Sequence, residues 1–381
     1  MDHVLPAART WAEIDLDALR HNFQYAKSQS GKKVMCVIKA DAYGHGAVRC
    51  GLYLQSIGAD AFAVACLSEA VELREAGIAK PLLVMGYTGP EYAEILAKYG
   101  IIQAVQDEAS AAALATEASK AGVELDVHVK IDTGMGRTGI LAQGQQAAIA
   151  AAEEIERIYQ LYGLSVKGLF THFSVADTPS EDAYTSWQLE NYHFVLNALS
   201  AKGIRPETCH SSNSAAIMAH PAAHLDMVRE GIMLYGLYPD SEPQISGPLR
   251  PVMTLKSRVG QVRDLPSGSS VSYGRTYISD HPIRTAIVTA GYADGHPRRL
   301  SNQATDTIGG KAYKQIGRIC MDMHMVDITG NNDIKPGDEV ILWGGEGMST
   351  EEVSKIVGTI NYELTCLVTR RSTRVYVGEC E

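Results

Sequence analysis

The chain has few features of a secreted, disulfide-bonded or membrane-spanning protein. Its seven cysteines are odd in number and none lies in a C-x-x-C pair, which argues against a disulfide framework and against a zinc site. No run of eighteen apolar residues occurs, so we expect no membrane span. The first twenty residues hold four acidic side chains and lack the apolar core of a signal peptide. These absences predict a cytoplasmic protein without a bound metal.

Basic side chains are also scarce relative to acidic ones. The 34 Lys and Arg residues face 44 Asp and Glu residues, the net charge is −10, and no basic cluster is longer than a pair. Nucleic acid is therefore not an expected partner. The 45% apolar and 20% charged content is typical of a globular enzyme. Because 381 residues exceed what one core usually accommodates, we expect two domains.

The first domain, residues 1–243, alternates short apolar runs with amphipathic helical segments. The runs lack the period-two pattern of strands that are wet on one face, which indicates parallel strands buried on both sides. Eight such strands with seven intervening helices predict an α/β fold, a (β/α)₈ TIM-type barrel, rather than an open doubly wound sheet. The predicted strands are 34–39, 61–66, 81–86, 101–105, 124–132, 166–173, 207–212 and 225–230.

The second domain, residues 244–381, is predicted to be mainly β. Its strand-like runs follow one another closely and are separated by Pro- and Gly-containing turns. One helix is expected after the capping box that Ser349 and Glu352 form. A strand-like segment at residues 10–15 has no obvious barrel partner and is a candidate to pair with this domain. The predicted strands are 252–264, 268–273, 284–291, 310–328, 338–343 and 372–378.

Lys39 ends the first apolar run, in the segment 37–46 that reads VIKADAYGHG. Burial lowers the cost of losing the proton from a lysine, and the neutral amine is the form that makes a Schiff base. Taken alone, such a lysine is more often a side chain whose head reaches solvent. The other strands favour the chemical interpretation, because charged or polar residues end several of them at the rim where barrels place their active sites.

The loops after strands seven and eight of such barrels commonly hold a phosphate. Here they offer the hydroxyl of Ser214 at a helix start and the backbone N–H groups of Gly231 and Ile232. A plain helix cap and a turn glycine are the simpler interpretation of each residue alone. Together with Lys39 across the barrel mouth, they favour a phosphate site and imply pyridoxal 5′-phosphate as the cofactor.

At this point the segment 37–46 resembles the cofactor-lysine signature of alanine racemases. The resemblance extends in order over nearly the whole chain, through segments at 130–137 (KIDTGMGR), 171–173 (THF), 213–215 (NSA), 229–231 (REG), 272–274 (SYG), 291–295 (GYADG), 320–322 (CMD) and 360–363 (INYE). It implies an isomerase that interconverts L-alanine and D-alanine by proton transfer at Cα and supplies D-alanine for peptidoglycan. It also implies a homodimer whose active sites are shared across the interface.

The resemblance assigns a role to each matching residue. Lys39 and Tyr273 would be the two acid/base residues, with Tyr273 reaching the site of the other subunit. Arg229 would contact the pyridine nitrogen and Arg137 the substrate carboxylate, which the backbone N–H of Met321 would also bind. The lysine that matches Lys130 is commonly carbamylated in this family. The remaining cofactor-binding or supporting residues would be Tyr43, His172, Asn213, Ser214, Gly231, Ile232, Tyr362, Asp322 and, at the entrance, Tyr292.

Other functions remain open from the sequence. A serine or broad-specificity racemase is the nearest alternative, because Thr138 and His324 depart from the usual pattern near the proposed site. Tyr362 favours alanine, since an aromatic ring would crowd the pocket. A barrel decarboxylase should carry an acidic residue where this chain has Arg229. A non-catalytic pyridoxal-phosphate carrier would not need the β domain.

Overall fold

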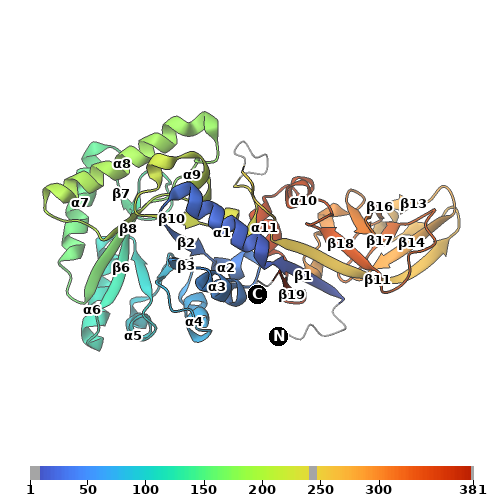
Figure 1. Cartoon of the computed structure of the whole chain (residues 1–381), viewed down its shortest axis with the longest axis horizontal. Helices are drawn as coiled ribbons and strands as arrows, with labels where there is room; N and C mark the ends of the chain where they lie inside the picture. The colour runs from blue at the N-terminus through green and yellow to red at the C-terminus, as the bar shows by residue number, and fades with distance from the viewer. Residues whose placement is uncertain (1–8, 240–246, 379–381) are drawn as a thin grey trace.

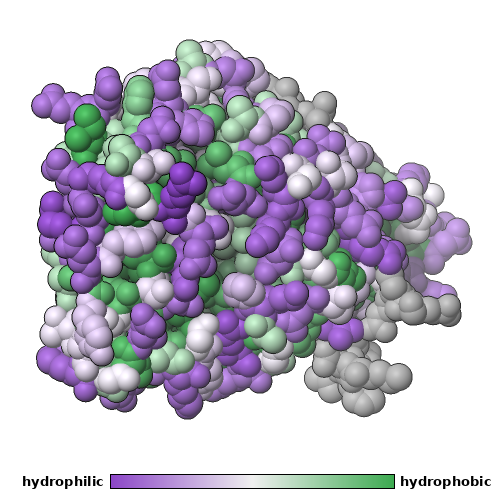
Figure 2. Space-filling view, turned by 60° about the vertical axis from the view of Figure 1, so that its left-hand side comes forward, coloured by the Kyte–Doolittle hydropathy of each residue, from purple (hydrophilic) through white to green (hydrophobic). Residues whose placement is uncertain are grey.

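The computed structural model describes residues 9–239 and 247–378. A helix-covered barrel and a β-rich domain lie side by side (Figure 1). The proposed division at 243–244 falls within 240–246, outside the described residues, and stays a prediction. In the face shown in Figure 2, hydrophobic residues lie interspersed among hydrophilic ones. None of the helices in the described ranges is both long and apolar enough to cross a bilayer.

The first sheet confirms the predicted barrel architecture. Its strands are parallel and follow the order β10-β2-β3-β4-β5-β6-β8-β9. Backbone N–H groups of Asp226 and Arg229 donate to the carbonyls of Cys209 and Ser212, which links the last strand back to β9. The strands are β2 (Lys33–Val37), β3 (Ala61–Val64), β4 (Leu82–Val84), β5 (Ile102–Val105), β6 (Leu125–Asp132), β8 (Leu164–Phe170), β9 (Thr208–His210) and β10 (Met227–Glu230).

Helices follow each barrel strand except the last, as the apolar periodicity predicted. The residue types expected at helix ends are found there. Asp107 caps α6 by accepting a hydrogen bond from the N–H of Ser110, and Gly122 ends that helix in the left-handed region. The helices are α1 (Leu16–Ser30), α2 (Lys39–Tyr43), α3 (Ala47–Ser56), α4 (Leu67–Glu75), α5 (Ala93–Lys98), α6 (Glu108–Ala121), α7 (Gln145–Tyr159), α8 (Asp182–Ala201) and α9 (Ser214–Ala219), with a short β7 (Ile140–Leu141) before α7.

The second sheet is built around β1 (Thr10–Asp15) and β11 (Met253–Leu265). β1 pairs antiparallel with β11 and parallel with β19 (Thr373–Val377), so the first strand of the chain belongs to the C-terminal sheet. The other strands of this sheet are β14 (Ile283–Val288), β15 (Thr305–Ile308), β16 (Lys311–Ile316), β17 (His324–Asp327) and β18 (Glu339–Trp343). The short strands β12 (Ser270–Val271) and β13 (Tyr277–Ile278) pair with each other in a separate two-stranded sheet.

Several predicted elements of this domain are wrong in detail. The single strand predicted over 310–328 is two strands, β16 and β17, joined by a loop that Gly317 opens with a φ of 73°. The strand predicted over 268–273 ends at Val271, because Ser272 turns the chain with a φ of 63°. The strand β15 was not predicted.

The helix expected after the capping box is confirmed, and a second helix follows it. Helix α10 (Thr350–Val357) starts at Ser349, which accepts a hydrogen bond from the N–H of Glu352. The unpredicted α11 (Asn361–Cys366) packs against α2. A Cβ at Gly44 would lie 2.2 Å from the carbonyl oxygen of Thr365, so only glycine permits this close approach between the domains.

Candidate active site

A cavity of about 850 Å³ opens where the barrel strands end, within the size range of small-molecule sites. It is lined by all the barrel residues that the sequence predicted for the site and by the one predicted residue of α11. These residues are Lys39, Tyr43, Lys130, Arg137, His172, Asn213, Ser214, Arg229, Gly231, Ile232 and Tyr362.

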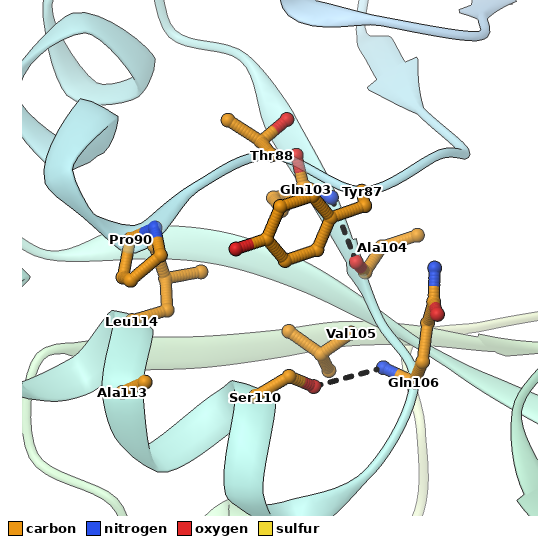
Figure 3. A pocket seen from close by; sticks show the side chains of 10 residues that line it. All are labelled: Tyr87, Thr88, Pro90, Gln103, Ala104, Val105, Gln106, Ser110, Ala113 and Leu114. Atoms are coloured by element: carbon orange, nitrogen blue, oxygen red, sulfur yellow. Dashed lines mark hydrogen bonds between the residues drawn. The ribbon is translucent and has the colours of Figure 1, made fainter.

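A second, much smaller cavity of about 130 Å³ lies between the end of β5 and α6 (Figure 3). Tyr87, Thr88 and Gln103 line it, and Ser110 accepts a hydrogen bond from the backbone N–H of Gln106 at 3.4 Å. It contains no lysine or arginine among its lining residues. A cavity of this size and character does not suit a phosphorylated cofactor. The cavity of about 850 Å³ is the candidate site because it brings Lys39, Arg137 and Arg229 together.

Lys39 lies two residues beyond the strand, because β2 ends at Val37 rather than at residue 39 as predicted. It opens α2, in which Ala40, Asp41, Ala42 and Tyr43 have φ values of 52–54°. Four successive non-glycine residues in the left-handed region are energetically costly, at roughly 1–2 kcal/mol per residue. Lys39 is thus presented by a turn that the surrounding structure must hold in place.

Hydrogen bonds from neighbouring elements hold this left-handed turn. The Glu69 carboxylate of α4 accepts from the N–H of Ala40 at 2.6 Å. The Asp41 carboxylate accepts from the N–H of Ala47 at 2.7 Å. Burial lowers the pKa of Lys39, and the nearby Arg137 guanidinium lowers it further. The turn therefore delivers an amine that gives up its proton more readily than an ordinary lysine.

Tyr43, Ser214 and Gly231 lie close together in the lining of the cavity. The Ser214 hydroxyl accepts a hydrogen bond from the N–H of Gly231 at 3.0 Å. A Cβ at Gly231 would lie 3.2 Å from the Tyr43 hydroxyl oxygen and 3.5 Å from Ser214 Oγ. Glycine therefore keeps open a small space bordered by two hydroxyls and a backbone amide, a donor set suited to phosphate oxygens.

The helix cap beside this space is Asn213 and not Ser214. Asn213 Oδ1 accepts from the N–H of Ala216 at 3.0 Å, which leaves the Ser214 hydroxyl to face the cavity. Ile232 starts a 3₁₀ helix, Ile232–Tyr235, directly after Gly231. The Tyr362 ring lies 6.0 Å from the Tyr43 ring, and burial raises the pKa of both phenols, which keeps them protonated.

Arg229 is buried at the base of the cavity, with 3% of its surface exposed. Its guanidinium donates to the carbonyls of Thr171, His210 and Ser211 at 2.7–3.0 Å and to the Nδ1 atoms of His210 and His172 at 3.0 and 3.3 Å. Burial lowers its pKa to about 10, so it remains charged near neutral pH. Within the described ranges neither carboxylate oxygen of the neighbouring Glu230 has a hydrogen-bond partner, so this acid does not pair with Arg229.

The contacts of Arg229 fix the tautomers of two histidines. Because a guanidinium only donates, His210 accepts through Nδ1 and carries its hydrogen on Nε2. That nitrogen lies 2.9 Å from His128 Nδ1, which therefore accepts. Burial and the Arg229 charge lower the pKa of His128 to about 4 and also lower that of His210. Neutral histidines thus surround a single buried cation.

Lys130 is buried with 6% of its surface exposed, and its Nζ lies 4.6 Å from the centroid of the Phe170 ring. Burial, Arg229 and Arg137 all lower its pKa well below the ordinary value for lysine. Arg137 lies on an exposed loop whose backbone the Asp132 carboxylate holds, accepting from the N–H of Arg137 at 3.0 Å. Two guanidinium groups and burial therefore favour the neutral form of the Lys130 amine.

Four predicted residues of the β domain lie outside this cavity. Tyr273 and Met321 expose 67% and 52% of their surface, and Tyr292 is also exposed. Asp322 accepts a hydrogen bond from Arg371 at 2.8 Å. Within the described part of the chain, none of the four lines the site that contains Lys39.

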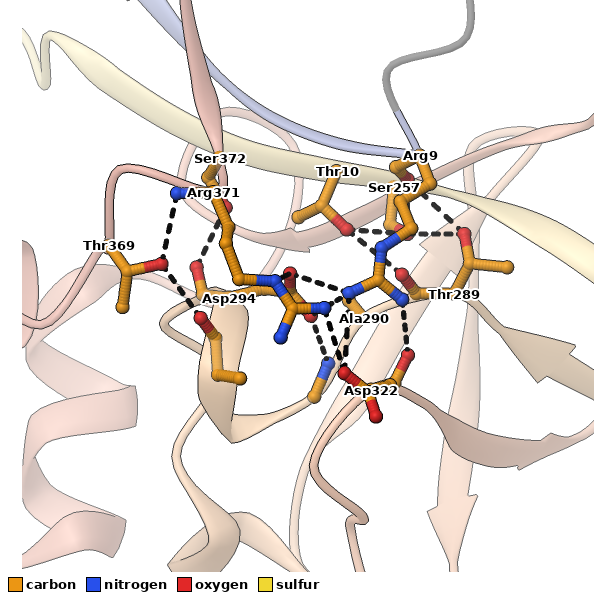
Figure 4. Close-up of polar contacts among 12 residues, drawn as sticks. Arg9, Thr10, Ser257, Thr289, Ala290, Asp294, Asp322, Thr369, Arg371 and Ser372 are labelled. Carbon is orange, nitrogen blue, oxygen red and sulfur yellow. Dashed lines mark hydrogen bonds and ion pairs between the residues drawn. The ribbon is translucent and has the colours of Figure 1, made fainter.

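An ion-pair network holds the loops that carry these residues (Figure 4). The guanidinium groups of Arg9 and Arg371 converge on the carboxylates of Asp294 and Asp322, with Arg9 at 2.9 Å from Asp294. A Cβ at Gly291 would lie 2.3 Å from the carbonyl oxygen of Cys320, so a glycine is needed where the two loops meet. The network fixes Tyr292 and Met321 relative to each other at the surface.

Sequence reasoning missed several residues of the cavity. Phe170 lies beneath Lys130 and stacks on His210, with ring centroids 5.0 Å apart. Glu363 and Cys366 come from α11, the helix that was not predicted. An i, i+4 spacing from Tyr362 to Cys366 was the available signal. Nothing in the sequence marked Phe170, which reads as an ordinary strand residue.

The cavity residues fit pyridoxal phosphate. The space that Gly231 keeps open is lined by hydroxyl and amide groups. Lys39 provides an amine of lowered pKa in the same cavity. Arg229 offers a buried donor that lines the same cavity.

Comparison with known proteins decides the family. The model of the alanine racemase N-terminal domain matches residues 14–239, and that of the C-terminal domain matches residues 252–376. The chain belongs to the alanine racemase family. The alanine racemase of Desulforamulus reducens is 42% identical over 371 residues, which cover 97% of this chain and 99% of that protein.

Solved structures of the alanine racemase family share the whole fold. The alanine racemase of Clostridium difficile has a TM-score of 0.91 at 40% identity, over 98% of this chain and 96% of that chain. A histidine racemase of Leuconostoc mesenteroides has a TM-score of 0.88 at 27% identity, over 98% and 99%. The same fold therefore occurs in racemases that are named for different amino acids.

Proposed function

We propose that the protein is an alanine racemase that interconverts L-alanine and D-alanine in the cytoplasm with pyridoxal phosphate, supplying D-alanine for peptidoglycan. The observation that carries this proposal is the pairing, in one cavity, of Lys39 with Arg229. A barrel decarboxylase should have a carboxylate in place of that guanidinium. Membership of the family supports alanine as the substrate.

Lys39 would hold the cofactor covalently, and Tyr43, Ser214, Gly231, Ile232 and Tyr362 would bind its phosphate, with Asn213 behind them. Pyridoxal phosphate supplies, when bound, an electron sink that makes the Cα proton of an amino acid removable. Burial favours the neutral form of the Lys39 amine, which can accept that proton from one side of Cα.

Inversion requires a second proton-transfer group on the other face of Cα. Tyr273 would serve this role in the site of a neighbouring subunit, where the Met321 backbone N–H would bind the substrate carboxylate. Both residues are exposed and remote from their own cavity, which supports a homodimer with shared active sites. Asp322 would hold the Met321 loop through its contact with Arg371, and Tyr292 would lie at the entrance.

Arg229 would limit the reaction to racemisation. Its guanidinium stays protonated and only donates, so it cannot deliver a full proton to a ring nitrogen that it contacts. His172 and His210 accept hydrogen bonds from it and hold its orientation. A weaker electron sink shortens the lifetime of the deprotonated substrate, so that reprotonation by Lys39 or Tyr273 competes well with other outcomes.

Lys130 would carry a carbamate that braces Arg137. Formation of a carbamate requires a neutral amine to attack carbon dioxide, and the lowered pKa of Lys130 supplies that form. The product is an anion between two guanidinium groups, which its Coulomb attraction to both would stabilise. Arg137 would then bind the substrate carboxylate.

A serine or broad-specificity racemase is the second candidate. This candidate stays open because a histidine racemase shares this fold. Tyr362 lines the cavity and its phenol is neutral, so its ring occupies space that a larger side chain would need. This supports alanine over larger substrates.

The first experiment follows L-alanine with the purified protein in D₂O, by polarimetry and by NMR of the Cα proton. We expect optical rotation to fall as deuterium enters Cα, and Lys39→Ala to abolish both changes. L-Serine and L-histidine are measured in parallel. An unchanged optical rotation and Cα proton signal of L-alanine with the cofactor bound, together with exchange of another amino acid, would refute alanine as the substrate.

A further inference from the structure

Three side chains that could bind a metal meet inside the β domain, apart from the cavity that contains Lys39. They are His296, which follows the Tyr292–Asp294 turn, Asp306 of β15 and His324 at the start of β17. Their candidate ligand atoms all lie within 4.8 Å of one another. All three residues are fully buried, at 0% exposure.

Three polar atoms of this cluster have no hydrogen-bond partner in the described structure. Both ring nitrogens of His296 and Oδ1 of Asp306 are buried without a hydrogen-bond partner in the described structure. The His296 ring stacks on that of His324, with centroids 4.6 Å apart. Buried polar atoms normally have partners, and an unsatisfied group requires an explanation such as a bound ion.

His324 is already oriented as a metal ligand. Its Nδ1 lies 2.8 Å from the carbonyl oxygen of Ala290, and because a carbonyl only accepts, Nδ1 carries the hydrogen. Its Nε2 forms a hydrogen bond of 2.5 Å with Asp306 Oδ2, and a metal ion would take the place of the hydrogen shared between these two atoms. A histidine that donates one ring N–H to a backbone carbonyl while the other nitrogen faces the ion is the usual second-shell arrangement of metal sites.

We propose that His296, Asp306 and His324 bind a divalent first-row transition metal, with Zn²⁺ as the preferred ion. Two imidazoles and one carboxylate are a common ligand set for zinc. The ion would separate Asp306 Oδ2 from His324 Nε2 to about 3.3 Å, the tetrahedral edge for bonds of about 2.0 Å. The lack of C-x-x-C pairs in the sequence argues only against a zinc site with thiolate ligands. It leaves a site with histidine and carboxylate ligands open.

The metal would be structural for the loops that serve the active site. His296 follows the turn that carries Tyr292, and His324 follows the loop that carries Met321. The N–H of Ala293 donates to the Met321 carbonyl at 3.0 Å, so the two loops are already in contact. An ion held between their ends would fix both loops from the buried side, as the Arg9 network does from the surface.

Metal content and thermal stability test this proposal. The purified full-length protein is dialysed against metal-free buffer and measured by elemental mass spectrometry, with about one zinc ion per chain expected. After EDTA treatment, added Zn²⁺ should raise Tm by about 5 °C or more. A metal content near zero, together with no change of Tm on adding Zn²⁺, would overturn the proposal.

The variant His296→Phe tests whether His296 is a metal ligand or a buried histidine that lacks hydrogen-bond partners. Phenylalanine keeps the stacked ring but removes both nitrogens, so the metal site predicts lost zinc and a lower Tm. An unsatisfied histidine without a metal predicts an unchanged or higher Tm. Asp306→Asn serves if His296→Phe does not fold. His281→Phe, at an exposed histidine of the same domain, controls for weak surface binding and should leave the zinc content unchanged.

Discussion

Two lysines face the mouth of the barrel, and burial lowers the pKa of both. Burial removes Lys39, Lys130 and Arg229 from water and lowers the pKa of each group. Burial favours the neutral form of both lysines, whereas the guanidinium of Arg229 keeps its charge near neutral pH. The cavity therefore combines one permanent buried cation with two amines that can react as neutral groups.

The pH dependence of Lys39 reactivity tests this arrangement. In protein freed of cofactor, we expect the rate of reaction with pyridoxal to rise with pH to an inflection below 10.5, the ordinary pKa of lysine. Arg137→Gln removes a charge that lowers the pKa of Lys39, so the inflection should move to higher pH. Visible absorbance follows the reaction.

Arg371→Gln is the matched control for that charge effect. It also removes one exposed guanidinium, but from the β domain, and should leave the inflection unchanged. An inflection at 10.5 in the unmodified protein would contradict the lowered pKa of Lys39.

Tyr273→Phe tests the second proton-transfer group. Loss of one general acid/base should reduce racemisation by about 10²–10⁴-fold while the cofactor stays bound. Deuterium exchange without inversion should persist for the one enantiomer whose Cα proton faces Lys39. Tyr277→Phe, in a neighbouring strand of the same domain, should retain full activity, and full activity in Tyr273→Phe would exclude the two-base scheme.

Individual site residues could be predicted where the chemistry is local to a motif. The resemblance placed Lys39, Arg229 and Ser214, and the structure brings them into one cavity. It could not indicate that Asn213 caps α9 in place of Ser214, because both are good cap residues. Nor could it indicate Phe170, whose importance arises from Lys130 and His210 packing on its two sides.

At the scale of elements, the turn α2 differs most from what local sequence favours. Alanine strongly prefers right-handed helix, yet Ala40 and Ala42 have positive φ values. The contacts with Glu69 and Ala47 override that preference. Strain of this kind occurs at functional sites, where surrounding structure determines the conformation.

Glycine substitution measures this strain. Ala40 is exposed with a φ of 52°, so Ala40→Gly should raise the free energy of unfolding by about 1 kcal/mol. Ala150 is equally exposed but lies in the right-handed helix α7, where Ala150→Gly should lower it by about 0.5–1 kcal/mol. Urea denaturation compares the two, and a loss of stability in both would contradict strain in α2.

The barrel strands could be predicted because each is an apolar run buried on both faces. In the β domain the same reasoning missed β15, since Thr305, Asp306 and Thr307 read as a polar loop. Asp306 is nevertheless fully buried and contacts His324. The hydrogen-bond partners of a buried polar residue can lie far away in the sequence. A local sequence pattern therefore does not show whether such a residue can be buried.

For the whole molecule, the decisive fact is that Tyr273 and Met321 lie outside their own chain's cavity. Large exposed apolar side chains grouped on one surface indicate an interaction site. Tyr273, Tyr292, Met321 and Met323 are all exposed in the β domain. A second copy of the chain would cover them and complete both sites.

Mixing two inactive variants tests the shared site. Lys39→Ala and Tyr273→Phe are each expected to be nearly inactive. Refolded together, they should form mixed dimers with one intact site each, which restores about a quarter of the activity of the unmodified protein. A mixture that stays inactive, although mixed dimers form, would show that each site is completed within one chain.

The position of β1 between β11 and β19 has a consequence for synthesis on the ribosome. β1 is made before every barrel strand, whereas β19 is made after all other strands of the chain. The barrel can therefore assemble while β1 still has two open edges. The nascent β domain stays incomplete until the final strand emerges, so premature termination before β19 leaves an exposed strand edge on an otherwise folded barrel.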